Sequence, residues 1–376
     1  MTEPTLTAPA PSEIEVSIFG RGYGEAIAIH VGDGRWLAID SIAESKKSVT
    51  LLYLKELGVD VANKLEVIVA THWHDDHVRG LAHLFTAAER AEIIVPLAML
   101  DKEFIKFAAS FSNQNSAKFS TGVEEFGKIL ALAKKRNIAG TRYPLRLAEH
   151  GYVGYRQPAG KLTHGAAVTL EALSPSHFDV AAFVTRISAV SPQPQVLQRT
   201  PHYGANDVSA AFWLQLGGDA ILLGADVENS GHPDSGWNAI LSDSVQPLSK
   251  ASLVKVPHHG GLSGHHDDMW TQLLEPAPVA SLTPWSKGGK KLPVDVDVTR
   301  ITALAGSSFS TGPSPFGKST DQPHMVAKTL RADALKLHKL GNKVGHIRHR
   351  ATVEAGQLTW HTDLFGQACR LSAMAA

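Results

Sequence analysis

Three histidines and two aspartates stand within seven residues, THWHDDH, from Thr71 to His77. Imidazole and carboxylate groups are good ligands for zinc and neighbouring divalent ions. His72 and His74 are two residues apart at an extended strand end, so their side chains point the same way and can share one ion. Where the chain then turns into a helix, Asp76 and His77 can face a second ion nearby. The density of ligands therefore predicts a site for two metal ions.

Two later strand ends carry residues that could complete this site. Asp226 follows the apolar run AILLGA, where its carboxylate could bridge two ions, and His258 follows SLVKVP, where it could close the second site. The next residue, His259, could protonate a leaving alkoxide as a general acid; a histidine that supports its neighbours or faces solvent is the simpler interpretation. The predicted metal ligands are His72, His74, Asp76, His77, Asp226 and His258, and the predicted catalytic groups are Asp76, Asp226 and His259.

The elements that must position these residues predict an α/β protein. LEVIVA, just before the first motif, is β-branched and bounded by polar residues, which is typical of a buried strand. IEVSIFG, AIAIHVG and DGRWLAID read as strands joined by glycine turns, whereas FGKILALAKKRN has helical spacing. Strands in both halves of the chain, with helices between them, favour an α/β sandwich with a helical insertion.

Composition limits the class of protein. The chain has 376 residues, 43% hydrophobic and 19% charged, and a single cysteine, Cys369, which excludes a disulfide framework. The first 13 residues, MTEPTLTAPAPSE, lack the apolar core of a secretion signal and are expected to form a disordered tail. No apolar run reaches the roughly 18–20 residues of a membrane helix. We therefore expect a cytoplasmic protein with no membrane partner.

Charge is balanced overall but uneven along the chain. Lys and Arg number 36, as do Asp and Glu, which argues against a surface coated in positive charge for nucleic-acid binding. Residues 287–350, however, hold 12 Lys and Arg against four Asp, a local net charge of +8. A solvated helical face is one interpretation, and a surface that meets an anionic substrate is the other.

THWHDDH, GAD and VPHHGG resemble the signature motifs of the metallo-β-lactamase fold superfamily. Asp40, in WLAID, matches the early aspartate of that fold, which organises ligands and does not usually bind metal itself. The similarity is greatest to the branch that contains the metallohydrolase domain of the DNA-uptake protein ComEC, with its G-x-G-[DE] turn (GYGE here), N-x-x-S strand (Asn206 and Ser209) and HHG loop. The motifs also resemble soluble, stand-alone members of this branch found among bacterial anti-phage defence genes.

The resemblance implies an αββα sandwich over residues 14–285, with an insertion at about 97–205. Residues 286–376 would form a basic C-terminal extension packed on the same domain. The superfamily usually gives its first metal a third histidine, where this chain has Asn206, with His202 a few residues earlier. Either residue could contact the first metal or the substrate, and the first site could hold its ion weakly.

These features together predict a metal-dependent hydrolase. Two divalent ions, zinc in the first place with manganese as the alternative, would share a bridging hydroxide and polarise a substrate oxygen. The ComEC-like motifs and the basic C-terminal third favour a nuclease or phosphodiesterase that acts on nucleic acid or another phosphodiester. One alternative is a hydrolase of lactones, β-lactams or cyclic nucleotides, although those subfamilies normally keep the third histidine. Another is a peptidase or effector that a protein partner from a defence system activates.

Overall fold

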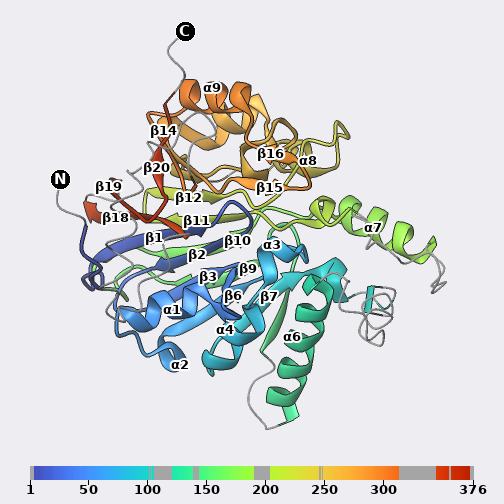
Figure 1. The fold of residues 1–376 in the computed structure, drawn as a ribbon, viewed down its shortest axis with the longest axis horizontal. Helices are drawn as coiled ribbons and strands as arrows, with labels where there is room; N and C mark the ends of the chain where they lie inside the picture. The colour runs from blue at the N-terminus through green and yellow to red at the C-terminus, as the bar shows by residue number, and fades with distance from the viewer. Residues whose placement is uncertain are drawn as a thin grey trace, which may run out of the picture.

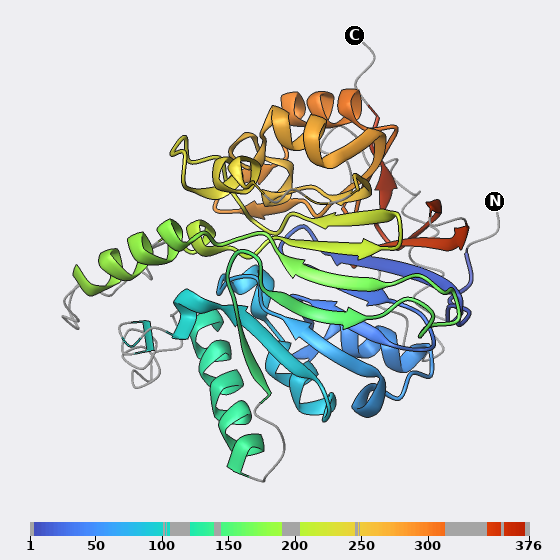
Figure 2. The same cartoon turned by 180° about the vertical axis from the view of Figure 1, so that it is seen from behind.

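The computed structural model describes residues 4–372, except 101, 103, 106–120, 139–143, 190–203, 245, 246, 248, 313–343, 355 and 356. Two eight-stranded sheets lie face to face in the middle of the molecule, and helices cover the outer face of each (Figures 1 and 2). This arrangement confirms the predicted αββα sandwich.

The first sheet joins strands from the two ends of the chain. Its strand order is β19 (Gln357–Phe365), β18 (Gly345–Glu354), β1 (Glu13–Gly20), β2 (Glu25–His30), β3 (Trp36–Ile39), β6 (Leu65–Val69), β7 (Glu92–Pro96) and β8 (Leu145–Ala148). The strand β6, which the apolar run LEVIVA predicts, lies between the parallel strands β3 and β7. A strand in this position is covered on both faces, which explains the apolar run Val67–Val69.

The second sheet is built mostly from the second half of the chain. Its order is β20 (Cys369–Arg370), β17 (Ser307–Ser310), β14 (Leu274–Leu282), β13 (Ala251–Lys255), β12 (Asp219–Leu223), β11 (Phe212–Leu216), β10 (Val168–Ala172) and β9 (Val153–Gln157). Two small hairpins stand outside the large sheets: β4 (Ala43–Glu44) with β5 (Lys47–Ser48), and β15 (Trp285–Lys287) with β16 (Lys290–Leu292).

The helices form the two outer layers. Against the first sheet pack α1 (Val49–Glu56), α2 (Val61–Lys64), α4 (Leu81–Ala87) and α6 (Thr121–Ile138). Against the second pack α8 (Gly236–Ser242), α9 (Asp295–Leu304) and the π-helical turn Met269–Leu273. Shorter elements lie near the strand ends: α3 (Asp75–Val78), and the 3₁₀ turns Leu97–Leu100, Asn206–Val208, His258–Gly260 and Leu262–Gly264. The helix α7 (His177–Ala189) projects from the side of the molecule.

Alternation along the strands divides the interior into separate cores. On β1, Ile14, Val16 and Ile18 face the layer between the two sheets, whereas Phe19 faces the helices. Successive strand residues point to opposite faces, so one strand can serve both cores. All four side chains are fully buried, which fixes the register of β1.

Segments that were predicted to lie outside the main body of the domain contribute to these layers. The segment predicted as an insertion, 97–205, supplies β8, β9 and β10, and the segment after 285 supplies β17 to β20. In the segment predicted as a disordered tail, the carbonyl oxygen of Thr5 accepts a hydrogen bond from Arg348 at 3.2 Å. Among the described residues, no helix combines the length and the apolar character needed to cross a bilayer.

Part of the basic charge after residue 287 is internal. Arg348 pairs with Asp363 at 2.6 Å and Arg350 with Glu15 at 2.8 Å, both on the first sheet. These two arginines therefore add little positive potential to the surface. Residues 313–343, which hold much of the remaining charge, lie outside the described residues.

Candidate metal centre

The predicted ligands follow the carboxyl ends of parallel strands in both sheets. Asp40 follows β3 and the THWHDDH motif follows β6, its parallel neighbour in the first sheet. Asp226 follows β12, and the His258–His259 pair follows β13, which is parallel to β12 in the second sheet. The carboxyl ends of parallel strands meet at one edge of a sheet, so the two sheets bring four segments to a common edge.

The structure groups these side chains into two adjacent clusters. The ligand atoms of His72, His74 and Asp226 lie within 4.8 Å of one another, and so do those of Asp76, His77 and His259. In the first cluster, His72 Nε2 is 3.1 Å from His74 Nδ1 and 3.7 Å from Asp226 Oδ2. In the second, His259 Nε2 is 3.6 Å from Asp76 Oδ2.

The Asp226 carboxylate lies between the two clusters. Its Oδ2 is 3.7 Å from His72 Nε2, 3.5 Å from His77 Nε2 and 3.6 Å from His259 Nε2. Two ligand atoms that each lie about 2.1 Å from a tetrahedral ion are roughly 3.4 Å apart. The observed spacings match that value and exceed an ordinary hydrogen bond, as expected for groups arranged around cations. If both clusters held ions, Asp226 would be a ligand common to the two sites.

Three buried atoms at the centre have no hydrogen-bond partner in the part of the chain that the structure describes. Among the described residues, Nε2 of His77, Nε2 of His259 and Oδ1 of Asp226 are buried and accept or donate no hydrogen bond. Leaving such atoms unpaired costs about 1–3 kcal/mol each, so native proteins normally satisfy them. Divalent ions would satisfy all three, and the donor set fits them.

Hydrogen bonds on the far sides of the rings fix their tautomers. His77 Nδ1 donates to Asp40 Oδ2 at 2.7 Å, and His259 Nδ1 donates to the carbonyl oxygen of Thr283 at 2.9 Å. His72 Nδ1 lies 3.0 Å from the Thr71 hydroxyl, which itself donates to Asp40 at 2.7 Å. A ring whose Nδ1 carries the proton presents a lone pair at Nε2, which is the form that binds metal. All three Nε2 atoms face the centre.

The supporting role of Asp40 stays a prediction, and its contacts in the structure are compatible with it. Asp40 is fully buried at a positive φ of 56°, and it accepts hydrogen bonds from the Thr71 backbone at 2.8 Å and from His77. One carboxylate thus orients both the start of the THWHDDH motif and one of its ligands. Side-chain atoms of Asp40, Glu25 and His77 lie within 4.8 Å of one another, so these residues form a third group that could hold a metal ion.

The charged states of the carboxylates and imidazoles at the centre depend on one another. Burial opposes the charged form of Asp226, but His259 and His77 outweigh it, and the pKa of this carboxyl lies well below its usual range. Burial lowers the pKa of His72 far below its ordinary value, and the neighbouring His77 adds to this effect. A buried carboxylate that stays ionised needs positive charge beside it, and a divalent ion is a suitable source.

The structure separates the two neighbouring histidines in a way that sequence did not predict. His259 is 2% exposed and belongs to the second cluster. The His258 ring contacts a different set of groups: its Nδ1 is 2.9 Å from Glu228 Oε1 and 2.7 Å from the Ser263 hydroxyl. The ligand role stays a prediction, and the geometry favours His259 for it over His258.

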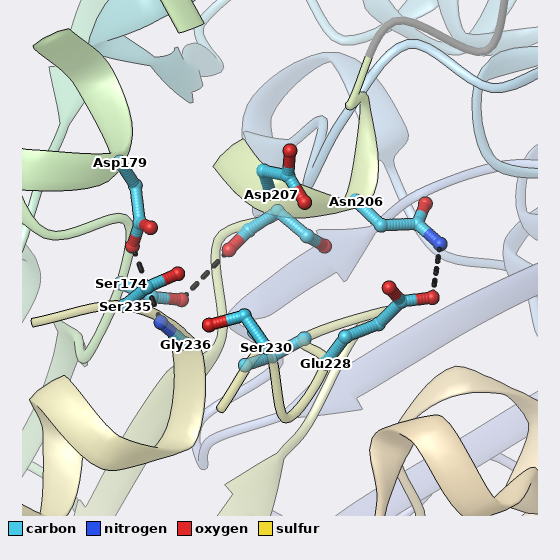
Figure 3. Close-up of a pocket in the computed structure, with 10 residues that line it drawn as sticks. Ser174, Asp179, Asn206, Asp207, Glu228, Ser230, Ser235 and Gly236 are labelled. Carbon is cyan, nitrogen blue, oxygen red and sulfur yellow. Dashed lines mark hydrogen bonds between the residues drawn. The ribbon is translucent and has the colours of Figure 1, made fainter. Parts of the chain in front are cut away.

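Asn206 and Glu228 lie beside the centre rather than inside it. The Asn206 amide nitrogen donates to Glu228 Oε1 at 3.1 Å, and it lies 3.4 Å from His258 Nε2. Figure 3 shows this amide pointing toward the adjacent Glu228 carboxylate, and both residues line a small pocket together with Ser209 and Asp207. Asn206 Oδ1 is buried and has no hydrogen-bond partner among the described residues, so it is available to an ion or a substrate. His202 lies outside the described residues.

A buried ion pair beneath the centre was missed by sequence reasoning. Lys255 and Glu25 are 0% and 1% exposed, come from different sheets, and meet at 2.5 Å. Glu25 Oε2 also accepts a hydrogen bond from the hydroxyl of Thr283 at 2.7 Å, and the Thr283 carbonyl holds His259. The only sequence signal was the acidic residue at the end of the GYGE turn.

Comparison with the sequences of known proteins does not assign the chain to a family. No family model matches the chain. One relative is the phosphoribosylformylglycinamidine synthase subunit PurL of Chlorobium luteolum, 28% identical over 181 residues, or 43% of this chain and 22% of that protein. The chain thus spans about a fifth of the relative that it matches.

Similar solved structures include metallo-β-lactamases and a flavo di-iron protein. MEM-A1, a subclass B3 metallo-β-lactamase from a soil metagenome, is 13% identical over 69% of this chain and 83% of its own, with a TM-score of 0.34. MIM-1 from Novosphingobium pentaromativorans is 16% identical over 68% and 82%, with a TM-score of 0.30. A mutant flavo di-iron protein from Thermotoga maritima is 13% identical over 55% and 36%, with a TM-score of 0.26. TM-scores this low say nothing about activity. The αββα architecture is evident from the two facing sheets and the helices that cover them.

Proposed function

We propose that this protein is a metal-dependent hydrolase that cleaves phosphodiester bonds. Two divalent ions would be held by the two clusters, one by His72, His74 and Asp226 and the other by Asp76, His77, His259 and the shared Asp226. The observation that carries the proposal is the position of Asp226 Oδ2, between 3.5 and 3.7 Å from three imidazole nitrogens of two clusters.

When bound, the ions supply Lewis acidity and a water of lowered pKa, which is the chemistry of hydrolysis near pH 7. The protein's own groups hold and orient this centre. Asp40 keeps the proton on Nδ1 of His77, and the Thr283 carbonyl does the same for His259. Asp76 and Asp226 carry the negative charge that selects divalent cations. Zinc suits this mixture of imidazole and carboxylate, and manganese is the alternative.

The choice of a phosphodiester substrate has two supports. The first is the set of ComEC-like motifs, from the GYGE turn to the HHG loop. The second is local charge, because Lys287 and Arg79 are exposed near the second cluster and could attract phosphate. Membership of the ComEC-like branch, a role in anti-phage defence and a protein partner stay predictions from sequence motifs.

The test combines metal content with cleavage. Zinc and manganese are counted per chain, and the protein is incubated with supercoiled plasmid, single-stranded DNA, single-stranded RNA and bis(p-nitrophenyl) phosphate. Asp226→Asn is the matched control, because it keeps the size of the side chain and removes the shared charge. We expect metal-dependent cleavage by the unaltered protein and none by Asp226→Asn. Bound metal without cleavage of any of these substrates would refute the phosphodiesterase activity but would still support the proposed metal centre.

A further inference from the structure

One wall of the metal centre is built from two segments that are far apart in the sequence. The turn 21–24 and the β15–β16 hairpin are joined by a hydrogen bond from the Ser286 backbone nitrogen to the Gly22 carbonyl oxygen, at 2.8 Å. The turn also packs against α3: a Cβ atom on Gly24 would lie 2.9 Å from the carbonyl oxygen of Asp76. The wall is therefore fixed against the element that carries a predicted ligand.

Two aromatic rings line this wall. Trp285 stacks on His259, with ring centroids 6.5 Å apart and an angle of 26° between the planes. Tyr23 lies beside it, with its centroid 6.3 Å from that of Trp285. Both rings are only half-buried, so parts of them remain accessible next to the second cluster.

Two cations lie near the Tyr23 ring. Lys287 Nζ lies 4.9 Å from the Tyr23 ring centroid and donates a hydrogen bond to its hydroxyl at 2.9 Å. The Arg79 guanidinium lies 5.9 Å from the same centroid; it also pairs with Asp75 at 3.2 Å, and its side chain is 46% exposed. We call Tyr23, Trp285, Lys287 and Arg79 the aromatic rim.

We propose that the aromatic rim binds the nucleotide next to the scissile phosphodiester, with the base stacked at Trp285 and Tyr23 and the flanking phosphate held by Lys287 and Arg79. This inference rests on the proposed function and names its substrate class as nucleic acid with unpaired bases. Aromatic faces stack on any base, and cations beside them track the backbone, so the site tolerates many sequences. In a duplex the base faces are already covered by their neighbours, so paired strands fit the rim poorly.

The register of the hairpin supplies a matched control. Trp285 pairs with Leu292 and Lys287 with Lys290, whereas Ser286 pairs with Lys291. Directly paired residues share a face of an antiparallel ribbon, whereas successive residues along one strand lie on opposite faces. Lys291 therefore has the same charge as Lys287 and is also exposed, but it lies on the face of the hairpin opposite the rim.

The test measures binding by fluorescence anisotropy with the metal-loaded protein. The probes are a decathymidylate and a decamer of tetrahydrofuran abasic residues, both with phosphorothioate linkages that slow cleavage. We expect Trp285→Ala to weaken binding of decathymidylate roughly fivefold or more beyond its effect on the abasic decamer, because stacking is lost. Trp285→Phe should recover much of this difference. Lys287→Ala should weaken both probes and reduce the salt dependence, whereas Lys291→Ala should change neither.

The outcomes separate this inference from the proposed function. Equal loss for the two probes in Trp285→Ala, or equal effects of Lys287→Ala and Lys291→Ala, would overturn the aromatic rim while hydrolysis of bis(p-nitrophenyl) phosphate still supports the hydrolase. Base-dependent binding without hydrolysis of any phosphodiester would support the rim and refute the function. A cyclic dinucleotide offers the same chemistry; if it displaces decathymidylate at lower concentrations than the unlabelled decamer does, the assignment to nucleic-acid strands is wrong.

Discussion

The adjacent residues His258 and His259 allow a sharp test of the metal centre. Replacing His259 with alanine removes one imidazole from the second cluster, in which its Nε2 is 3.6 Å from both Asp76 and Asp226. Replacing His258 removes a ring whose contacts are with Glu228, Ser263 and Asn206. The two substitutions are chemically identical and one residue apart, so each controls for the other.

The expected size of the effect follows from the number of ligands. A structural zinc site binds with roughly 10–16 kcal/mol shared among four ligands, or about 3 kcal/mol for each. Removing His259 should therefore weaken binding of one ion on the order of 100-fold. Removing His258 breaks a partly buried pair with Glu228, which should cost about 1 kcal/mol of stability and no metal.

The assay is a competitive titration with a chromogenic chelator, followed by metal counting after dialysis. We expect His259→Ala to lose one ion of two, and His258→Ala to keep both. Loss of an ion from His258→Ala with full retention in His259→Ala would show that the His258–His259 loop (Pro257–Gly261) presents the other ring to the centre, and would refute the assignment. Circular dichroism on both variants distinguishes loss of a ligand from loss of the fold.

Three further predictions concern buried polar residues outside the predicted ligand set. Lys255→Met should destabilise the fold by about 3–5 kcal/mol in urea unfolding, because it leaves Glu25 buried and unpaired, and adding Glu25→Gln should restore part of this loss. Asp40→Asn should weaken metal binding about 10- to 100-fold by calorimetry, since His77 loses the charged acceptor that orients it; an unchanged affinity would contradict that role. Burial lowers the pKa of His30 to about 4, so its folded form is neutral, and the free energy of unfolding should fall as pH drops from 6.5 toward 4, by up to about 3 kcal/mol; His30→Gln should flatten that slope.

The sequence predicted the parts of this centre that depend on short-range pattern. His72, His74, Asp76 and His77 stand in fixed register after an apolar strand, so their proximity follows from strand and helix geometry alone. Asp226 was predicted for the same reason, because it ends a strand of the opposite sheet. In each case the local run of residues carries both the element and the side chain that it presents.

The choice between the two histidines depends on backbone geometry that no periodicity reveals. His258 and His259 have φ values of 45° and 55°, and Gly260 has 81°. In such a left-handed loop the alternation of a strand no longer decides which ring faces inward. The sequence predicts His258 as the ligand, whereas the structure groups His259 with Asp76 and His77.

Long-range pairing explains the other differences. Arg350 counted toward a basic surface, but it pairs with Glu15 because β18 lies beside β1, more than 300 residues away. The ion pair of Glu25 and Lys255 likewise joins strands of different sheets. Neither contact follows from composition, since each depends on which strands become neighbours in space.

The GYGE turn connects the metal centre to the aromatic rim. Tyr23 is part of the aromatic rim and contacts Lys287 there. Glu25, two residues later, is buried against Lys255 and Thr283. Gly24 between them has φ of 104° and leaves no room for a Cβ atom, which would lie 2.5 Å from Ile42 and 2.9 Å from Asp76. The glycine is thus required by space as well as by conformation. One rigid turn therefore sets the position of a substrate-facing ring and of the carboxylate that, through Thr283, orients His259.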